Sequence, residues 1–180
     1  MSSTHELPSG QEGEICLRGP NIFKGYYQNA DATSSSFING WFRSGDIGYI
    51  DSEGNLFLTD RYKELIKYNG FQVAPAQLEG LLLGHEAVDD VAVIGVWSRE
   101  RETELPRAYV VVAKGYRAGR ELEREVCGWL EKKVAPYKRL RGGVRFIDEI
   151  PKSAAGKVLR RVLVEQAKNE EEMRRVSPKL

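Results

Sequence analysis

The stretch 41-WFRSGDIGYIDSEGNLFLTDRYKELIKYNGFQVAPAQLE-79 decides how this chain folds. Residues 47–50 and 55–59 are mostly apolar segments, and they flank the polar residues 51–54, Asp-Ser-Glu-Gly. Two apolar runs on either side of a turn that contains Asp and Gly are typical of a β-hairpin. Residues 65–69 predict a further short strand, because they end at a glycine turn signal.

The sequence before this stretch predicts short elements. Residues 14–18 alternate in the manner of a strand and precede a Gly-Pro turn signal. Residues 29–37 predict a short helix, for which Asp31 or Thr33 is the candidate N-cap. We therefore expect residues 1–60 to form a β-rich segment.

After residue 60 the pattern changes to alternating helices and strands. Pro75 suits the first turn of a helix in which Leu78, Leu81 and Leu82 share one face. Further elements are predicted as strands over 88–96, 107–114 and 144–147 and as helices over 120–134 and 158–168. We therefore predict an α/β (α+β) fold class, in which residues 61–180 form a small sheet covered by helices.

Gly128 lies inside the predicted helix 120–134. A glycine inside a helix costs about 1 kcal/mol relative to alanine, so we expect close packing at this position to explain it.

The composition excludes several classes of function. Of 180 residues, 27 are Lys or Arg and 26 are Asp or Glu, which leaves a formal net charge of +1. This balance gives no overall field to attract nucleic acid or an acidic membrane surface. No apolar run approaches the about 20 residues of a membrane-spanning helix.

Transition-metal and thiol chemistry have few candidate residues. The chain has two cysteines, Cys16 and Cys127, without CxxC spacing, which favours free thiols in a reduced compartment. His5 and His85 are the only histidines, and no His/Cys cluster predicts a metal centre.

Three short segments carry side chains suited to phosphate and sugar chemistry. In Ser44-Gly45-Asp46, the carboxylate could accept two hydroxyl hydrogen bonds, as a ribose requires, although such a turn is also common without any function. Residues 60–73 form a polar junction, a strand and a turn, which also fits a solvent-exposed edge hairpin protected by lysines. Residues 151–161, PKSAAGKVLRR, place Lys157 in a small-residue loop before a helix, without the P-loop spacing; the alternative is a plain loop leading into a basic helix.

In combination, these segments resemble the C-terminal motifs of adenylate-forming enzymes, the superfamily of acyl-CoA synthetases, 4-coumarate–CoA ligases and luciferases. Residues 41–48 resemble the W-x-x-T-G-D segment, and residues 60–75 resemble D-R-x-K-E-x-I-K-x-x-G-x-Q-V-x-P. Residues 151–161 resemble P-K-[ST]-x-x-G-K-[IVL]-x-R-[RK]. The resemblance runs from about residue 13 to residue 163 and is nearest to 4-coumarate–CoA ligase-like and fungal acyl-CoA ligases. It implies that residues 1–60 end the large AMP-binding domain and that residues 61–180 are the mobile C-terminal domain.

The resemblance also implies roles for residues on both sides of this boundary. Asp46 would hold the ATP ribose, and Arg61 would contact the ribose or the phosphates. Lys63 would be the hinge about which the small domain swings. Lys157 would stabilise the charge that develops when the substrate carboxylate attacks the α-phosphorus.

For the second half-reaction, the resemblance implies a different surface. Lys67, Gly70 and Gln72 would line the side used for thioester formation, with Lys67 and Gly70 at the CoA. Gly70 lacks a Cβ, so a pantetheine arm could pass close to the backbone. Many relatives carry Lys where this chain has Asn69.

The implied cofactors are ATP/AMP and CoA, with Mg²⁺ bound mainly by the large domain. The Ser/Thr/Gly-rich phosphate loop of that domain, its acid-binding pocket and its aromatic-Gly-x-Thr-Glu turn have no counterpart in this sequence. We therefore expect the chain to be the C-terminal portion of an ATP-dependent acyl- or aryl-CoA ligase and to be inactive by itself. The alternatives are a stand-alone fragment that acts as a complementing or interaction domain, and an adenylation domain that loads a carrier protein.

The last three residues, Pro178, Lys179 and Leu180, resemble the C-terminal S-K-L peroxisomal address. We therefore expect peroxisomal import by its receptor, with a cytoplasmic location as the alternative. The expected substrates are a small carboxylic acid, ATP and CoA.

Overall fold

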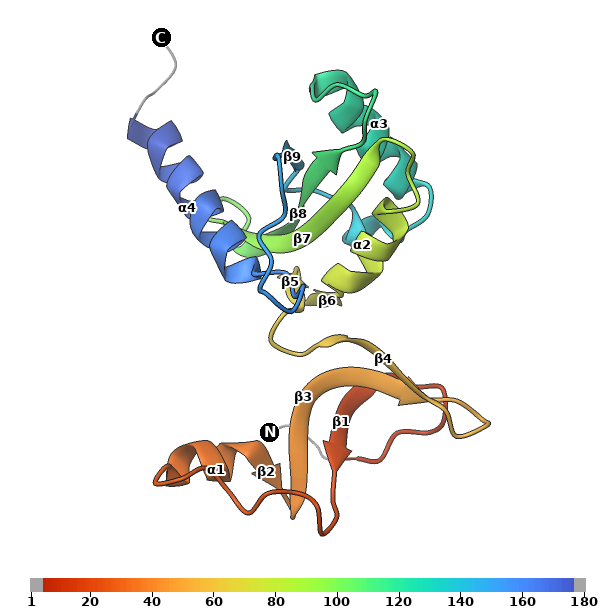
Figure 1. Ribbon diagram of the computed structural model, residues 1–180, viewed down its shortest axis with the longest axis vertical. Coiled ribbons are helices and arrows are strands. Elements are labelled where there is room, and N and C mark those ends of the chain that lie inside the picture. The colour runs from red at the N-terminus through yellow and green to blue at the C-terminus, as the bar shows by residue number, and fades with distance from the viewer. Residues whose placement is uncertain (1–4, 177–180) are drawn as a thin grey trace. The chain divides into compact units, whose positions relative to one another are not determined.

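The computed structural model describes residues 5–176 and divides the chain into two compact units, residues 1–63 and 64–180 (Figure 1). The predicted peroxisomal signal, Pro178-Lys179-Leu180, lies outside the described residues, so that expectation stays a prediction.

Over residues 5–63, the N-terminal unit is a small antiparallel sheet with one short helix. Its elements are β1 (Gly13–Leu17), α1 (Ala30–Ser36), β2 (Phe37–Ile38), β3 (Trp41–Ile50) and β4 (Leu56–Arg61). The long strand β3 pairs with β1, β2 and β4, each time antiparallel. The predicted hairpin therefore forms from β3 and β4, with β3 beginning several residues before the expected start.

The N-cap of α1 differs from the sequence expectation. The side chain of Asn29 accepts a hydrogen bond from the backbone nitrogen of Ala32 at 2.9 Å, so Asn29 is the N-cap instead of Asp31 or Thr33. The hydroxyl of Thr33 instead donates to the carbonyl of Asn29 at 2.8 Å, because Thr33 already lies inside the first turn.

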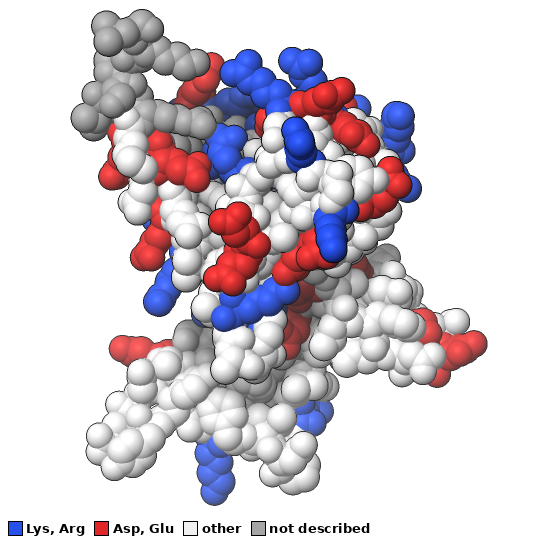
Figure 2. Space-filling view, turned by 45° about the horizontal axis from the view of Figure 1, so that its top comes forward, with Lys and Arg blue, Asp and Glu red and all other residues white. Residues whose placement is uncertain are grey.

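The N-terminal unit has almost no interior of its own. Among its described residues, 5–63, only Gly48 is buried. Large apolar side chains of this unit are exposed instead: Leu7, Leu17, Phe23, Tyr26, Tyr27, Ile50, Leu56, Phe57, Leu58 and Tyr62. On the face shown in Figure 2, this unit is largely uncharged, whereas basic and acidic side chains are interspersed over the C-terminal unit. A sheet with exposed apolar residues of this size is expected to be covered by further protein.

Over residues 64–176, the C-terminal unit contains two sheets and three α-helices. Its elements are β5 (Ile66–Tyr68), β6 (Phe71–Val73), α2 (Pro75–Leu82), β7 (Val88–Ser98), β8 (Thr103–Val112), α3 (Arg120–Glu131), a short 3₁₀ helix (Pro136–Lys138), β9 (Val144–Phe146) and α4 (Arg160–Val176). Strands β5 and β6 form a separate hairpin. In the larger sheet, β7 and β8 are antiparallel and β9 pairs parallel to β8.

The larger sheet is the middle layer of this unit (Figure 1). Val91 and Val93 of β7 face a cluster that includes Leu78 of α2 and Val126 of α3. The alternate residues of β7, with Ile94 among them, pack instead in a second cluster with Leu163 and Ala167 of α4. A strand that is buried on both faces fixes its register strongly, because a shift by one residue would exchange the two faces. Helices on both sides of a small sheet confirm the predicted α/β (α+β) fold class.

Strand β8 begins at Thr103, earlier than expected, and contains Pro106. A proline is tolerated only where a strand needs no ladder donor on one side. Strand β9 pairs only with Ala108–Val110 of β8, so no strand pairs with Pro106 on that side of β8. The carbonyl of Pro106 accepts a hydrogen bond from the backbone nitrogen of Gly142 at 2.8 Å.

The expectation of close packing at Gly128 is wrong. A Cβ built on Gly128 would meet no other atom within 4 Å, so the space beside α3 is open there. Nothing in the structure explains this glycine.

Replacing Gly128 with alanine should therefore raise the free energy of unfolding by about 0.5–1 kcal/mol, because the helix gains propensity without a clash. Urea denaturation followed by circular dichroism measures this change. Gly142→Ala is the matched control: its Cβ would lie 2.9 Å from Arg107 Cβ and 3.0 Å from the carbonyl oxygen of Pro106, so it should destabilise the chain. A loss of stability in Gly128→Ala would contradict the open space beside α3.

The thiol of Cys127, also on α3, is held in its neutral form. Burial raises the pKa of Cys127 to about 11, and Glu123 and Glu131 add to the rise. The pKa of Cys16 is raised as well, mainly by burial. A raised pKa keeps a thiol unreactive until the pH approaches that value, so neither cysteine is suited to be a nucleophile at neutral pH.

Between pH 7 and 9, we expect Cys127 to react with a disulfide reagent at least about tenfold more slowly than free cysteine, because about 1% or less is thiolate there. The rate should rise about tenfold per pH unit over this range. Mass spectrometry of the labelled peptide measures the rate, with free cysteine in a parallel reaction as reference. Rapid labelling at pH 7 that levels off by pH 8 is the result that would contradict the raised pKa.

Candidate functional site

Strands β3 and β4 bring Asp46 and Arg61 together as opposite residues of the ladder. Arg61 Nε donates to Asp46 Oδ1 at 3.0 Å, and the two side chains are 56% and 29% exposed. Gly45 precedes the carboxylate with φ +75°, a conformation that suits glycine, and its carbonyl accepts from the backbone nitrogen of Tyr62 at 2.8 Å. The arrangement presents a carboxylate for hydroxyl groups and a guanidinium for phosphates, side by side and open to solvent.

Lys63 is the last residue of the N-terminal unit, and Glu64 is the first residue of the C-terminal unit. Lys63 is exposed and lies in a turn between β4 and β5. Its role as a hinge stays a prediction.

The β5–β6 hairpin brings Lys67 and Gln72 together as a cross-strand pair, and both are exposed. Side chains of directly opposite residues lie on the same face of a sheet. The turn consists of Asn69 and Gly70, with φ angles of 46° and 81°. Two successive positive φ angles are typical of the type I′ turn that suits a tight hairpin. This turn favours glycine at residue 70 whether or not a ligand binds there.

The hairpin is anchored to β8 by two residues to which sequence reasoning gave no role. The backbone nitrogen of Lys67 donates to Glu104 Oε2 at 2.7 Å. The hydroxyl of Thr103 donates to the carbonyl of Lys67 at 2.8 Å and accepts from the backbone nitrogen of Asn69 at 2.8 Å. Thr103 is buried, and it was missed because the strand was expected to begin at residue 107. These contacts fix the backbone beneath the exposed Lys67 side chain.

The loop that carries Lys157 is closed by backbone hydrogen bonds. Leu159 nitrogen donates to the carbonyl of Pro151, and Ser153 nitrogen donates to the carbonyl of Lys157, each at 2.8 Å. Gly156 adopts φ +78° and donates to the carbonyl of Ser153 at 2.8 Å. Lys157 is therefore held on a defined backbone while its side chain remains 54% exposed.

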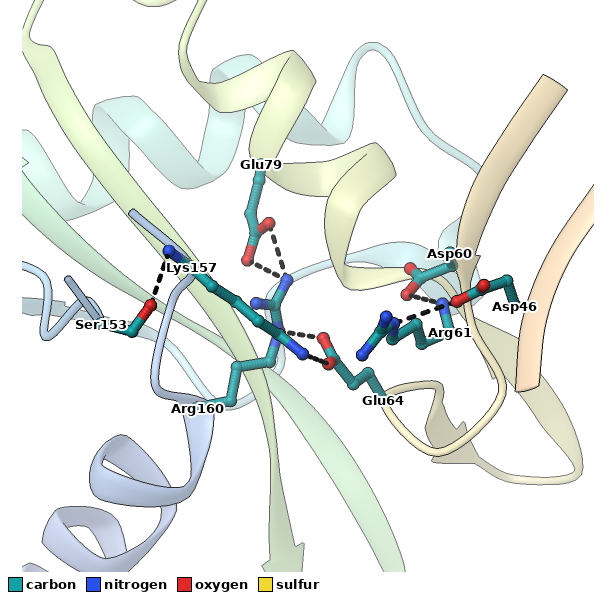
Figure 3. Close-up of polar contacts among 8 residues, drawn as sticks. All are labelled: Asp46, Asp60, Arg61, Glu64, Glu79, Ser153, Lys157 and Arg160. Atoms are coloured by element: carbon teal, nitrogen blue, oxygen red, sulfur yellow. Dashed lines mark hydrogen bonds and ion pairs between the residues drawn. The ribbon is translucent and has the colours of Figure 1, made fainter. Parts of the chain in front are cut away.

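Lys157 belongs to a network of alternating charges (Figure 3). Its ammonium lies 3.6 Å from Glu64 Oε1, and Arg160 Nε lies 3.3 Å from Glu64 Oε2. Arg160 Nη2 also donates to both carboxylate oxygens of Glu79, at 2.9 Å each. Sequence reasoning gave no role to Glu64, Glu79 or Arg160, although Glu64 and Arg160 lie within the recognised motifs.

The described part of the chain was compared with the side-chain clusters that typically hold a metal ion and with helices that span membranes. Within residues 5–176, no three or more His, Cys, Asp or Glu side chains are grouped so as to hold a metal ion. No helix in the same range has the length and apolar character to cross a membrane.

Comparison with known protein families finds one domain. Residues 77–157 match the model of the AMP-binding enzyme C-terminal domain. This range begins inside α2 and ends at Lys157, so it includes most of the C-terminal unit.

Comparison with individual proteins extends the similarity to both units. A putative acyl-coenzyme A synthetase from Emericella nidulans is 50% identical over 166 residues, which are 91% of this chain and 29% of the relative. The 4-coumarate–CoA ligase-like 4 protein of Oryza sativa subsp. japonica is 49% identical over 166 residues, 92% of this chain and 29% of the relative.

Among solved structures, ATP-bound MatB from Rhodopseudomonas palustris matches with a TM-score of 0.82 and 36% identity. The match covers 90% of this chain and 31% of MatB. The chain thus spans less than a third of the length of these three relatives.

Proposed function

We propose that the chain is the C-terminal portion of an AMP-forming acyl- or aryl-CoA ligase. The support is its similarity, over 91% of its length, to part of an acyl-CoA synthetase and the match of residues 77–157 to the AMP-binding enzyme C-terminal domain. In the reaction, a carboxylic acid and ATP give acyl-AMP and pyrophosphate. The thiol of CoA then displaces AMP and gives the thioester.

In the first step, Lys157 acts as an electrostatic catalyst. When the carboxylate oxygen bonds to the α-phosphorus and the bond to pyrophosphate breaks, negative charge grows on the phosphoryl oxygens and the leaving group. A cation already in place stabilises that charge without reorganisation. Support comes from the closed loop of Lys157, which fixes its backbone while its ammonium remains exposed.

Asp46 and Arg61 bind the nucleotide in this scheme. The Asp46 carboxylate accepts hydrogen bonds from the ribose hydroxyls, and Arg61 contacts the ribose or the phosphates. Their pairing at 3.0 Å supports the assignment, since the two groups required at one end of a nucleotide are already adjacent.

In the second step, the β5–β6 hairpin receives CoA. Lys67 and Gln72 lie on one face of the hairpin, and Gly70 adds no side chain at its tip. The hydrogen bonds from Thr103 and to Glu104 support this role, because they make the hairpin a firm platform. The C-terminal unit turns about Lys63 between the two steps.

The observation that carries the proposal is the division of the predicted site residues between two units with different interiors. Asp46 and Arg61 belong to the unit without a buried core, whereas Lys67, Gln72 and Lys157 belong to the unit with one. We infer that the acid pocket, the adenine site and the ligands of any Mg²⁺ come from protein that covers the N-terminal unit. A separate complementing chain could provide the same cover, and a carrier protein could replace CoA in the second step.

The roles of Lys157 and of the hairpin can be separated in a longer ligase that ends in this sequence. Lys157→Ala should lower acid-dependent ATP–pyrophosphate exchange by about 100-fold or more, because a preplaced charge is lost. The same variant should change thioester formation from preformed acyl-AMP by less than about threefold. Lys67→Ala and Gln72→Ala should show the opposite pattern, and replacing CoA with a carrier protein tests that alternative.

Lys168→Ala, at an exposed lysine of α4, is the matched control and should leave both half-reactions unchanged. Equal losses in both half-reactions for all the variants would contradict the division of roles. The 180-residue chain should show no exchange alone. If exchange appears when a separate large domain is added, the complementing-chain alternative is favoured.

A further inference from the structure

We propose that Glu64 is a positioning residue that holds the ammonium of Lys157, and that Arg160 and Glu79 fix Glu64 for this purpose. The inference rests on the adenylation role of Lys157 proposed above. It adds to that role a series of charged contacts that begins beside strand β7 of the C-terminal unit and ends at the Lys157 ammonium.

This series of contacts begins at Glu79 on α2. Its Oε1 accepts a hydrogen bond from the backbone nitrogen of Val93 at 2.7 Å, and Val93 is fully buried in β7. Both Glu79 oxygens lie 2.9 Å from Arg160 Nη2, and these two side chains are 15% and 18% exposed. Charge-assisted hydrogen bonds that are shielded from water are strong, so Arg160 has a fixed position.

Arg160 also forms with Glu64 an ion pair that lacks the geometry of a hydrogen bond. Arg160 Nε lies 3.3 Å from Glu64 Oε2, and the Glu64 side chain is 24% exposed. The other oxygen, Oε1, is the one that lies 3.6 Å from Lys157 Nζ. The two oxygens of one carboxylate thus face two different cations, as the sticks in Figure 3 show.

The last contact differs from the inner ones in strength. The Lys157–Glu64 distance of 3.6 Å is longer than a hydrogen bond, and Lys157 is the most exposed member of the network at 54%. Exposed ion pairs of this kind are weak. Glu64 attracts the flexible lysine side chain toward one position. Because the pair is weak, a phosphate oxygen can replace the carboxylate at little cost.

This combination suits a group that must be in place before its substrate and free to bind it. A lysine side chain loses much conformational entropy when it is ordered, and prior ordering lowers that loss during the reaction. If Arg160 and Glu79 served only to join α4 to α2, their own contacts would suffice. The contact of Arg160 with Glu64 joins α4 to a third segment, the one before β5, and brings the Glu64 carboxylate beside Lys157.

The ordering of Lys157 can be measured in the 180-residue chain by NMR relaxation of ¹³C-labelled lysine ε-methylenes. In Glu64→Gln, the order parameter of Lys157 should fall by about half, into the range of flexible side chains. Lys152, which pairs with Asp90 Oδ2 at 2.5 Å, should keep its order parameter and serves as the internal control. Glu165→Gln, at an exposed carboxylate on α4, is the matched variant and should change neither lysine.

Glu79→Gln offers a second route to the same test, because a weaker hold on Arg160 should also loosen Lys157. Circular dichroism shows whether each variant keeps its fold. An unchanged Lys157 order parameter in folded Glu64→Gln overturns the proposal.

The effect of Glu64 on activity is tested in the longer ligase. Glu64→Gln should lower acid-dependent ATP–pyrophosphate exchange by about three- to tenfold and leave thioester formation from acyl-AMP within about twofold. Glu64→Asp, which keeps the charge, should recover part of the loss. If Lys157→Ala abolishes exchange while Glu64→Gln does not reduce it, the positioning role is overturned. If the unaltered ligase shows no acid-dependent exchange, the proposed function fails, and the order parameters alone decide whether Glu64 holds Lys157.

Discussion

The burial of β7 on both faces is the constraint on which the C-terminal unit depends. Its odd-numbered valines, 91 and 93, pack toward α2 and α3, and Ile94 packs toward α4. The same strand gives a backbone donor to Glu79, so the apolar core also sets the position of the charged network that reaches Lys157. A change that disturbed β7 would therefore affect the chemistry as well as the fold.

The sequence predicted the elements with strong periodicity and missed features that depend on distant contacts. Local patterns of apolar and turn residues predict three features: the hairpin of β3 and β4, the helix that begins at Pro75, and strands β7 and β8. The N-cap of α1 was misassigned, because Asn29, Asp31 and Thr33 are all plausible caps and only geometry selects one. Gly128 showed that a glycine in a helix need not mark close packing.

The residues of the candidate site fall into two groups. The sequence motifs identify one group, and only the folded structure identifies the other. The resemblance identified Asp46, Arg61, Lys67 and Lys157, whose side chains are exposed or partly exposed and whose roles remain predictions. It assigned nothing to the residues that hold them. Arg160 and Glu79 are 81 positions apart, and no local pattern in the sequence links such a pair. Supporting contacts of this kind become visible only once the helices and the sheet are packed.

The central claim is that the C-terminal unit is a self-sufficient body, whereas the N-terminal unit requires further protein to cover it. Urea denaturation of residues 64–180 and of residues 1–63 as separate polypeptides, followed by amide NMR and circular dichroism, tests this most directly. The account predicts a dispersed spectrum and one cooperative transition for residues 64–180, and neither for residues 1–63. A cooperative transition in residues 1–63 alone, or its absence in residues 64–180, would contradict the account.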